Sequence, residues 1–129
     1  MFIHATLNPA EPGLEAQRLL TRVEKEEIEA STSALTVDEV IWVVKRMRGM
    51  DRALEVGDAL INMRGLELIS VDENVLRDSL GLMRLHGFDP RDAIHAASAL
   101  RCGADFIVSS DSHFDSLGRP PRKTITDKV

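Results

Sequence analysis

The sequence contains a single cysteine, Cys102, among its 129 residues. One cysteine excludes a disulfide within the chain and is typical of a reducing compartment, so we expect a cytoplasmic protein. No apolar run approaches the ~18 residues of a membrane span, and no signal-peptide pattern opens the chain. The sequence also lacks a cluster of cysteines and histidines at ligand spacing, which disfavours a zinc site.

An excess of positive charge is missing as well, since the formal net charge is −5. This balance argues against indiscriminate binding of nucleic acid through a positive surface. A nuclease stays compatible with it, because bound divalent cations offset local acidic charge. The basic residues gather in two groups, which are either solvent-exposed faces or a rim that follows phosphates around an acidic centre. These groups are Lys45, Arg46, Arg48 and Arg52, and Arg119, Arg122 and Lys123.

Helical and strand patterns alternate along the chain, which predicts βα units and a parallel sheet. With 43% hydrophobic residues, residues 1–129 suffice for one domain with a core and are too few for two. Asp72 and Asp89 are good N-caps, and Gly49, Gly87 and Gly103 end helices. The spacing predicts helices over 15–26, about 36–48, 51–62, about 73–86 and 90–102, a helical turn near Phe114, and strands over 28–31, 66–71, 106–108 and near 124–125.

Acidic residues occur at the points where these elements begin or end. Asp92 falls in the first turn of the helix that Asp89 and Pro90 open, and Asp111 follows the strand over 106–108. Ligands of open α/β sheets bind outside the carboxyl ends of the strands, so these two acids are expected to face one another. Two carboxylates repel unless a cation joins them, and carboxylate ligands favour a hard cation, Mg²⁺ or Mn²⁺.

Each of these acids also has a purely structural interpretation. Glu39 completes a capping box that starts at Thr36, and an acid such as Asp92 in a first helical turn is favoured by the helix dipole. Asp111 and Asp115 are compatible with ordinary turns. His95 shares a helix face with Asp92, but a lone histidine on an apolar helix is more often packed or hydrogen-bonded than catalytic.

The helix over 36–48 is apolar on nearly all of its faces. Val37, Val40, Ile41 and Val44 form one stripe, whereas Trp42, Val43 and Met47 lie on other faces. Such a helix needs cover on more than one side. We expect a homodimer contact here; the alternative is a helix held between its own sheet and another helix.

Three segments and the order of the elements together resemble the PIN-domain family, closest to the VapC-type toxins of prokaryotic toxin–antitoxin pairs and their archaeal relatives. The segments are residues 33–39 (SALTVDE), 91–99 (RDAIHAASA) and 104–115 (ADFIVSSDSHFD). The resemblance implies an α/β/α sandwich around a parallel sheet and Mg²⁺- or Mn²⁺-dependent hydrolysis of RNA phosphodiesters. It also implies that Glu39, Asp92 and Asp111 are catalytic, metal-binding acids, that Asp115 is a possible fourth ligand, and that Ser110 supports the site by hydrogen bonding. The implied partners are RNA and a small antitoxin protein that blocks the site.

The beginning of the chain departs from the family's pattern. Family members usually begin with a hydrophobic strand that ends in an aspartate, shortly before a segment like Met1–Ala5. We therefore expect an N-terminally truncated domain whose first strand and first acid are missing. This leaves a second hypothesis, a catalytically incomplete PIN-like module that binds RNA or acts as a scaffold.

A third hypothesis is an unrelated α/β domain of response-regulator shape, whose clustered acids also bind Mg²⁺. That fold expects an acid pair after the first strand and a lysine after the last. The chain offers only Lys123, which precedes the last predicted strand.

Overall fold

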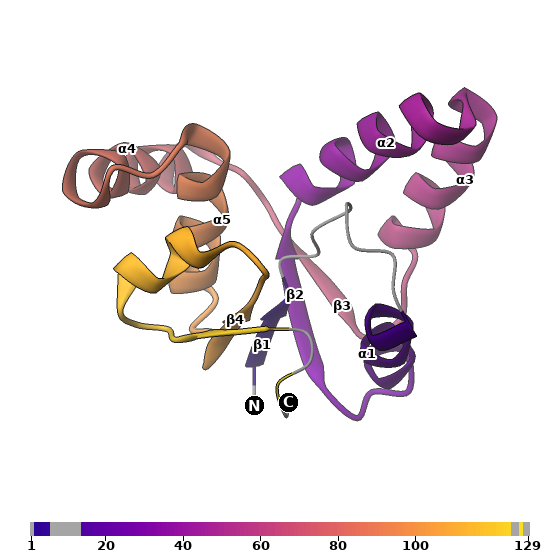
Figure 1. Cartoon of the computed structure of the whole chain (residues 1–129), viewed down its shortest axis with the longest axis horizontal. Helices are drawn as coiled ribbons and strands as arrows, with labels where there is room; N and C mark the ends of the chain where they lie inside the picture. Colours follow the sequence, from indigo (N-terminus) through magenta and orange to yellow (C-terminus); the bar gives the residue numbers. More distant parts are fainter. Residues whose placement is uncertain (1, 6–13, 125–126, 128–129) are drawn as a thin grey trace.

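The computed structural model describes residues 2–5, 14–124 and 127. They form a five-stranded sheet in the order β3-β2-β1-β4-β5, in which every neighbouring pair of strands is parallel (Figure 1). The elements are β1 (Phe2–Ala5), α1 (Leu14–Glu24), β2 (Glu29–Ser33), α2 (Leu35–Arg48), α3 (Met50–Ile61), β3 (Leu66–Ile69), α4 (Glu73–His86), α5 (Pro90–Arg101), β4 (Phe106–Val108), the 3₁₀ helix η1 (Ser112–Leu117) and β5 (Arg122–Lys123).

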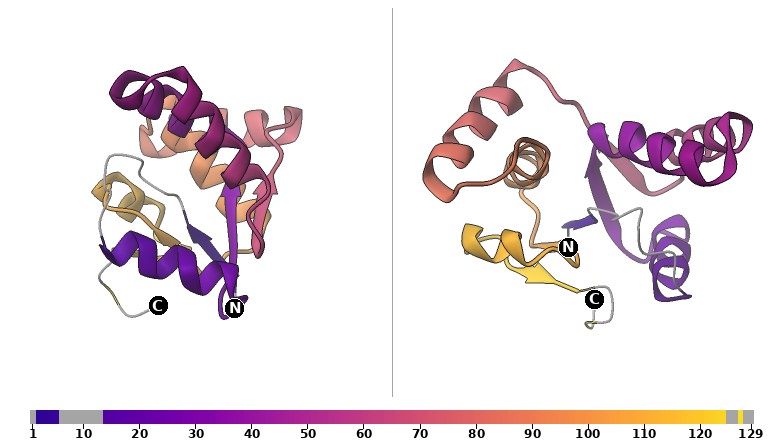
Figure 2. Two further views of the ribbon diagram at one scale, coloured as in Figure 1. Left: turned by 90° about the vertical axis from the view of Figure 1, so that its right-hand side faces the viewer. Right: turned by 45° about the horizontal axis from the view of Figure 1, so that its top comes forward.

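The helices lie on both sides of this sheet. In Figure 1 and in the right view of Figure 2, α4 and α5 lie on one side, and α1, α2 and α3 lie on the other. The predicted parallel α/β fold with helices around the sheet is therefore confirmed. Within the part of the chain that the structure describes, no helix is long and apolar enough to span a membrane.

The centre of the sheet differs from our expectation. We expected the first strand to be missing, but β1 occupies the central position, with Phe2 opposite Glu29 of β2 and Ile3 opposite Phe106 of β4. Without it, the facing edges of β2 and β4 would lose backbone hydrogen-bond partners in the middle of the sheet. β1 contains no acidic residue and ends at Ala5, so the expected acid is absent from this strand.

Most helix ends lie where the sequence predicts them. The side chain of Asp72 caps α4 by accepting a hydrogen bond of 2.9 Å from Val75 N, and Gly87 ends that helix with φ 69°. Asp89 is the N-cap residue of α5 and is followed by Pro90, although its side chain makes no capping hydrogen bond. β5 lies slightly before the predicted last strand, because Arg122 pairs with Ile107; Ile125 lies outside the described residues.

The capping box predicted for Glu39 is wrong. α2 begins at Leu35 with Ala34 at its N-cap, and no side chain caps it there. Ser33 instead accepts a hydrogen bond of 3.1 Å from Leu35 N, just after β2 ends. Glu39 is therefore two residues beyond the position from which a capping box closes, and its carboxylate is available for another partner.

α5 is the most deeply buried helix of the domain. Its inner face consists of small residues that are fully buried: Ala93, Ala96, Ala97 and Ala99. Ala93, Ala96 and Ala99 form a cluster with Ile107 of β4 and with Phe114 of η1, which is also buried. This packing holds the N-terminus of α5 and the start of η1 against the same part of the sheet.

α2 contacts α3 extensively, yet part of its surface is left uncovered by the described residues. The side chains of Trp42 and Met47 are 55% and 68% exposed, whereas Val40 is buried. Gly57 of α3 lies against Ile41, since a Cβ on Gly57 would lie 2.8 Å from the Ile41 Cδ1 atom. Its own sheet and α3 thus cover only part of α2.

Candidate metal centre

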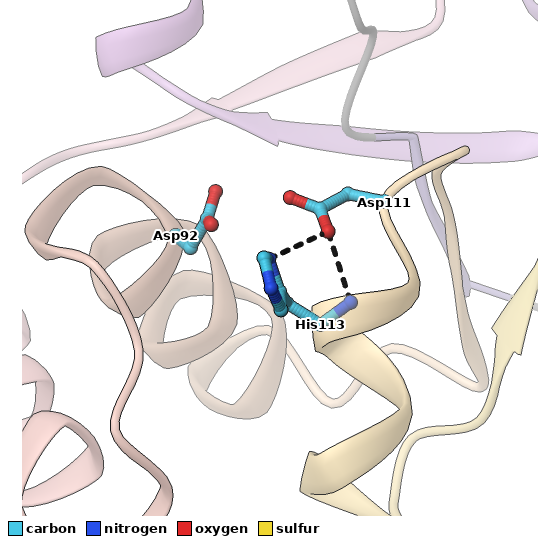
Figure 3. Close-up of side chains that lie close together, drawn as sticks. All are labelled: Asp92, Asp111 and His113. Atoms are coloured by element: carbon cyan, nitrogen blue, oxygen red, sulfur yellow. Dashed lines mark hydrogen bonds and ion pairs between the residues drawn. The ribbon is translucent and has the colours of Figure 1, made fainter.

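Two of the predicted acids lie together at the carboxyl edge of the sheet. Asp92 lies in the first turn of α5, and Asp111 lies three residues after the end of β4, as the N-cap residue of η1. With His113 they form a group in which one ligand atom from each residue lies within 4.8 Å of the others (Figure 3). The three side chains point toward one another from α5 and from the loop that leads into η1.

Asp111 is held in place by hydrogen bonds on both its backbone and its side chain. Its N–H donates to the Oγ of Ser109 at 3.0 Å, and Ser109 is buried. Its Oδ1 accepts a hydrogen bond from the backbone N–H of His113 at 2.9 Å and lies 3.0 Å from the Nδ1 of the same histidine. The position of this carboxylate is therefore fixed by the local fold.

The electrostatic environment of Asp92 is unfavourable for a negative charge. Burial raises the pKa of its carboxyl group, and the neighbouring charge of Asp111 raises it further. A hydrogen bond between the two carboxyl groups acts in the same direction, because only the protonated form of one of them can donate it. A divalent cation would remove this repulsion, and the two carboxylates are the type of ligand that Mg²⁺ and Mn²⁺ prefer.

Among the described residues, Glu39 lies outside this group and instead contacts His95. The Oε1 of Glu39 lies 2.5 Å from the Nε2 of His95, which is on α5 one turn after Asp92. The side chain of His95 is 4% exposed and that of Glu39 is 23% exposed. The predicted packed and hydrogen-bonded histidine is thus what the structure shows, and its partner is a predicted site residue.

Asp115 has a different partner. Its two carboxylate oxygens accept hydrogen bonds from Arg122 at 2.8 and 3.1 Å, and this arginine lowers the pKa of Asp115. Arg122 also donates to the backbone oxygen of Ser109 at 3.1 Å, so it joins η1 to the end of β4. The structure brings Asp92 and Asp111 together but engages Asp115 in an ion pair.

The two basic groups also differ in their surroundings. Arg122 is committed to Asp115, and the Nζ of Lys123 lies 4.3 Å from the centre of the Phe106 ring. The group on α2 and α3 is exposed, and Arg46 lies over the Trp42 ring at 4.6 Å. For Arg122 and Lys123 of the second group, the structure therefore favours a structural role over a phosphate-binding rim.

The order of elements, the sheet and these acids agree with a comparison against protein families. The family model described as "PIN domain" matches residues 2–120. This chain belongs to the PIN domain family.

Solved structures resemble this PIN domain over nearly its whole length. One is VapBC2 from Rickettsia felis bound to a DNA fragment from its promoter, with a TM-score of 0.72, 14% identity, and coverage of 96% of this chain and 98% of that one. DNA-bound VapBC from Salmonella typhimurium gives 0.67 and 15%, covering 96% and 97% of the two chains. VapBC-1 from nontypeable Haemophilus influenzae gives 0.66 and 13%, covering 98% and 100%. No curated protein matches the sequence.

His113 is the residue of this group that the sequence interpretation missed. Its spacing to the other histidines matches no metal-binding pattern, so the sequence pattern does not single it out. The useful signal is its position two residues after Asp111, where the N-cap turn of η1 returns its backbone and its ring to the aspartate. Its side chain is 74% exposed, so the PIN domain presents this imidazole at the open side of the group.

Proposed function

We propose that this PIN domain is a ribonuclease that depends on Mg²⁺ or Mn²⁺ and acts as the toxin of a toxin–antitoxin pair. The observation that carries the proposal is the convergence of Asp92, Asp111 and His113, whose ligand atoms lie within 4.8 Å of one another. The raised pKa of Asp92 supports it, because the site is unfavourable for two bare carboxylates and favourable for a cation.

In this proposal Asp92, Asp111 and Glu39 are the metal-binding acids, and His113 is an additional ligand. When bound, the ion would lower the pKa of a water molecule and neutralise charge on the phosphoryl oxygens of RNA. Asp111 contributes a carboxylate that Ser109 and the backbone of His113 already orient. Asp92 contributes a carboxylate whose negative charge, disfavoured by burial and by Asp111, the ion would stabilise. Asp115 stays a prediction from the family resemblance, and its ion pair with Arg122 favours a structural role.

The partners are part of the same proposal. The similar structures are named VapBC, and a further one is described as a toxin–antitoxin complex from Klebsiella pneumoniae (TM-score 0.60, 16% identity). We infer from this likeness a small antitoxin that covers the site. We infer a homodimer from the large apolar side chains that are exposed on the adjacent helices α2 and α3. These side chains are Trp42, Met47, Met50, Leu54 and Ile61.

The alternative is a PIN module that binds RNA without cleaving it. One observation favours this alternative: β1, at the centre of the sheet, brings no acid to the carboxyl edge. Three acids and a histidine hold an ion less firmly than a set completed by a fourth carboxylate. The two hypotheses therefore differ in turnover and agree in fold.

The test is cleavage of RNA by the 129-residue chain with Mn²⁺, with Mg²⁺ and with a chelator. We expect cleavage that needs the metal and that Asp92→Asn and Asp111→Asn each abolish. Asp51→Asn is the matched control, because Asp51 is also an acid in a first helical turn but is exposed on α3.

Two outcomes would contradict the nuclease proposal. Cleavage by Asp92→Asn at the rate of the unaltered chain would show that this group is not the active site. Binding of RNA with no cleavage under any of the metal conditions would favour the binding module instead.

A further inference from the structure

His95 occupies an unusual position for a histidine in a core helix. His95 is 3% exposed and lies among small residues in the middle of the buried face of α5. Its Nε2 contacts the Glu39 carboxylate on α2 at 2.5 Å, whereas its Nδ1 is buried and has no hydrogen-bond partner among the described residues. The Nε2 atom thus contacts Glu39, whereas the Nδ1 atom has no hydrogen-bond partner in the described part of the chain.

The chemistry of the two groups defines the direction of this hydrogen bond. A carboxylate offers only acceptor atoms, so the Nε2 of His95 must carry the proton and donate it. The Nδ1 has no acceptor in reach, so a proton there would be buried without a partner. The arrangement therefore favours a proton on Nε2 that is directed at Glu39.

A purely structural role explains this geometry poorly. An aliphatic side chain would fill the space between α2 and α5 without burying an unpartnered nitrogen, which is costly. The polar ring is explained if the orientation of Glu39 matters. His95 also lies one helical turn from Asp92 on the same face of α5, so its contact with Glu39 ties Glu39 to the helix that carries Asp92.

We propose that His95 is a positioning residue that fixes the carboxylate of Glu39 for binding of the divalent ion. This inference rests on the proposed metal centre at Asp92 and Asp111. His95 acts through Glu39 and does not itself contact the ion. Hydrogen-bond partners of metal ligands typically change metal affinity by about 10- to 100-fold when they are replaced.

The test measures the affinity of the 129-residue chain for Mn²⁺ by calorimetry, with no RNA present. We expect His95→Leu to weaken Mn²⁺ binding by about 10- to 100-fold, because Leu fills much of the volume but donates nothing. His95→Gln keeps an N–H donor at about the distance of Nε2 and is expected to restore most of the affinity. In a Glu39→Gln background, His95→Leu should cause little further loss, since its effect passes through Glu39.

The unaltered protein provides a second measurement, which stays decisive if the leucine variant fails to fold. A ¹H–¹⁵N spectrum should show a protonated Nε2 and a bare Nδ1 on His95, and both signals should shift when Mg²⁺ is added. A proton on Nδ1 instead of Nε2, or His95 signals unchanged by Mg²⁺ that demonstrably binds, would overturn the proposal.

The controls separate this inference from the function on which it rests. If Asp92→Asn binds Mn²⁺ as tightly as the unaltered chain, the proposed metal centre is wrong and the role of His95 falls with it. If Asp92→Asn loses the ion while His95→Leu and His95→Gln keep it equally well, only the role of His95 is wrong.

Discussion

Without metal, the Asp92→Asn variant should be more stable than the unaltered chain. With the metal ion bound, the unaltered chain should be the more stable of the two. Ligand oxygens of Asp92 and Asp111 lie within 4.8 Å of each other, and burial and the Asp111 charge raise the pKa of Asp92. Asn is neutral and has nearly the same volume. The substitution therefore removes the repulsion and also removes a charge that the ion requires.

The size of the effect follows from the distance. Two unit charges separated by 4.8 Å repel by about 3.5 kcal/mol at an effective dielectric constant of 20, and by about 1 kcal/mol in bulk water. Because Asp92 is only half-buried, we expect a value of about 1–2 kcal/mol. Loss of an acid from the first turn of α5 opposes this by about 0.3–1 kcal/mol. The net gain in the free energy of unfolding is then between about 0 and 1.7 kcal/mol in the absence of metal.

The pH dependence has a defined sign. The pKa of Asp92 is raised in the folded state above its ordinary value of 3.8, so the folded protein binds more protons than the unfolded chain just above that pH. The unaltered chain therefore loses stability as the pH rises through this window, whereas Asp92→Asn does not. Near pH 3 the carboxyl group of Asp92 is neutral, as the Asn side chain is at every pH, so the free energies of unfolding of the unaltered chain and of Asp92→Asn should converge.

The assay is denaturant unfolding in a chelator at several pH values, repeated with Mn²⁺. Saturation at about 100 times the dissociation constant adds about 2.7 kcal/mol to the unaltered chain and nothing to Asp92→Asn, so the order of stability reverses. Asp51→Asn, which changes an acid in the first turn of α3, should lose only the dipole contribution. The reasoning is refuted if Asp92→Asn is destabilised at pH 7 in chelator by as much as Asp51→Asn.

Three further substitutions test other parts of the structure. Gly65→Ala should cost more than about 2 kcal/mol in chemical unfolding, because φ is +82° and the new Cβ would lie 2.2 Å from the backbone oxygen of Val23; unchanged stability would show that this turn is not rigid. Trp42→Glu should convert dimers to monomers in light scattering, and a monomeric unaltered chain would remove that argument. Asp115→Asn should leave the Mn²⁺ affinity unchanged in calorimetry, while the free energy of unfolding falls because Arg122 loses its partner. The pKa of Asp115 is lowered in the folded state, so the stability that this ion pair contributes is present above pH 3.8 and is lost as the pH falls through the lowered pKa. Loss of Mn²⁺ binding by this variant would instead support Asp115 as a ligand.

Local chemistry explains why most helix ends could be predicted from the sequence. Asp72 and Gly87 act within a few residues of themselves, through a capping hydrogen bond and a positive φ. The central strand could not be predicted in the same way. β1 is defined by its pairing with residues 29–31 on one side and 106–108 on the other, and such distant pairing leaves no local pattern.

In the candidate site too, some features could be predicted from the sequence and others depend on distant contacts. Asp92 and Asp111 could be placed together because helix starts and strand ends meet at one edge of a parallel sheet. The partner of Glu39 could not be foreseen, since His95 is 56 residues away in sequence. The capping pattern around Thr36 suggested a local partner, and the tertiary contact replaced it. Asp115 fits the family pattern equally well, but an arginine seven residues later takes up its carboxylate.

The alanine face of α5 has a consequence for how this domain can change. Asp92 lies in the first turn of a helix that meets Ile107 and Phe114 through Ala93, Ala96 and Ala99, so the backbone of α5 lies close to these residues and has no large side chain at this contact that could adjust. Any larger residue there must push the helix itself outward, and Asp92 moves with it. A displacement of about 1 Å at reacting groups can cost about 100-fold in rate. Substitutions of these alanines by larger residues should therefore abolish activity at the site while the fold persists. Folded but inactive descendants are an expected product of this architecture.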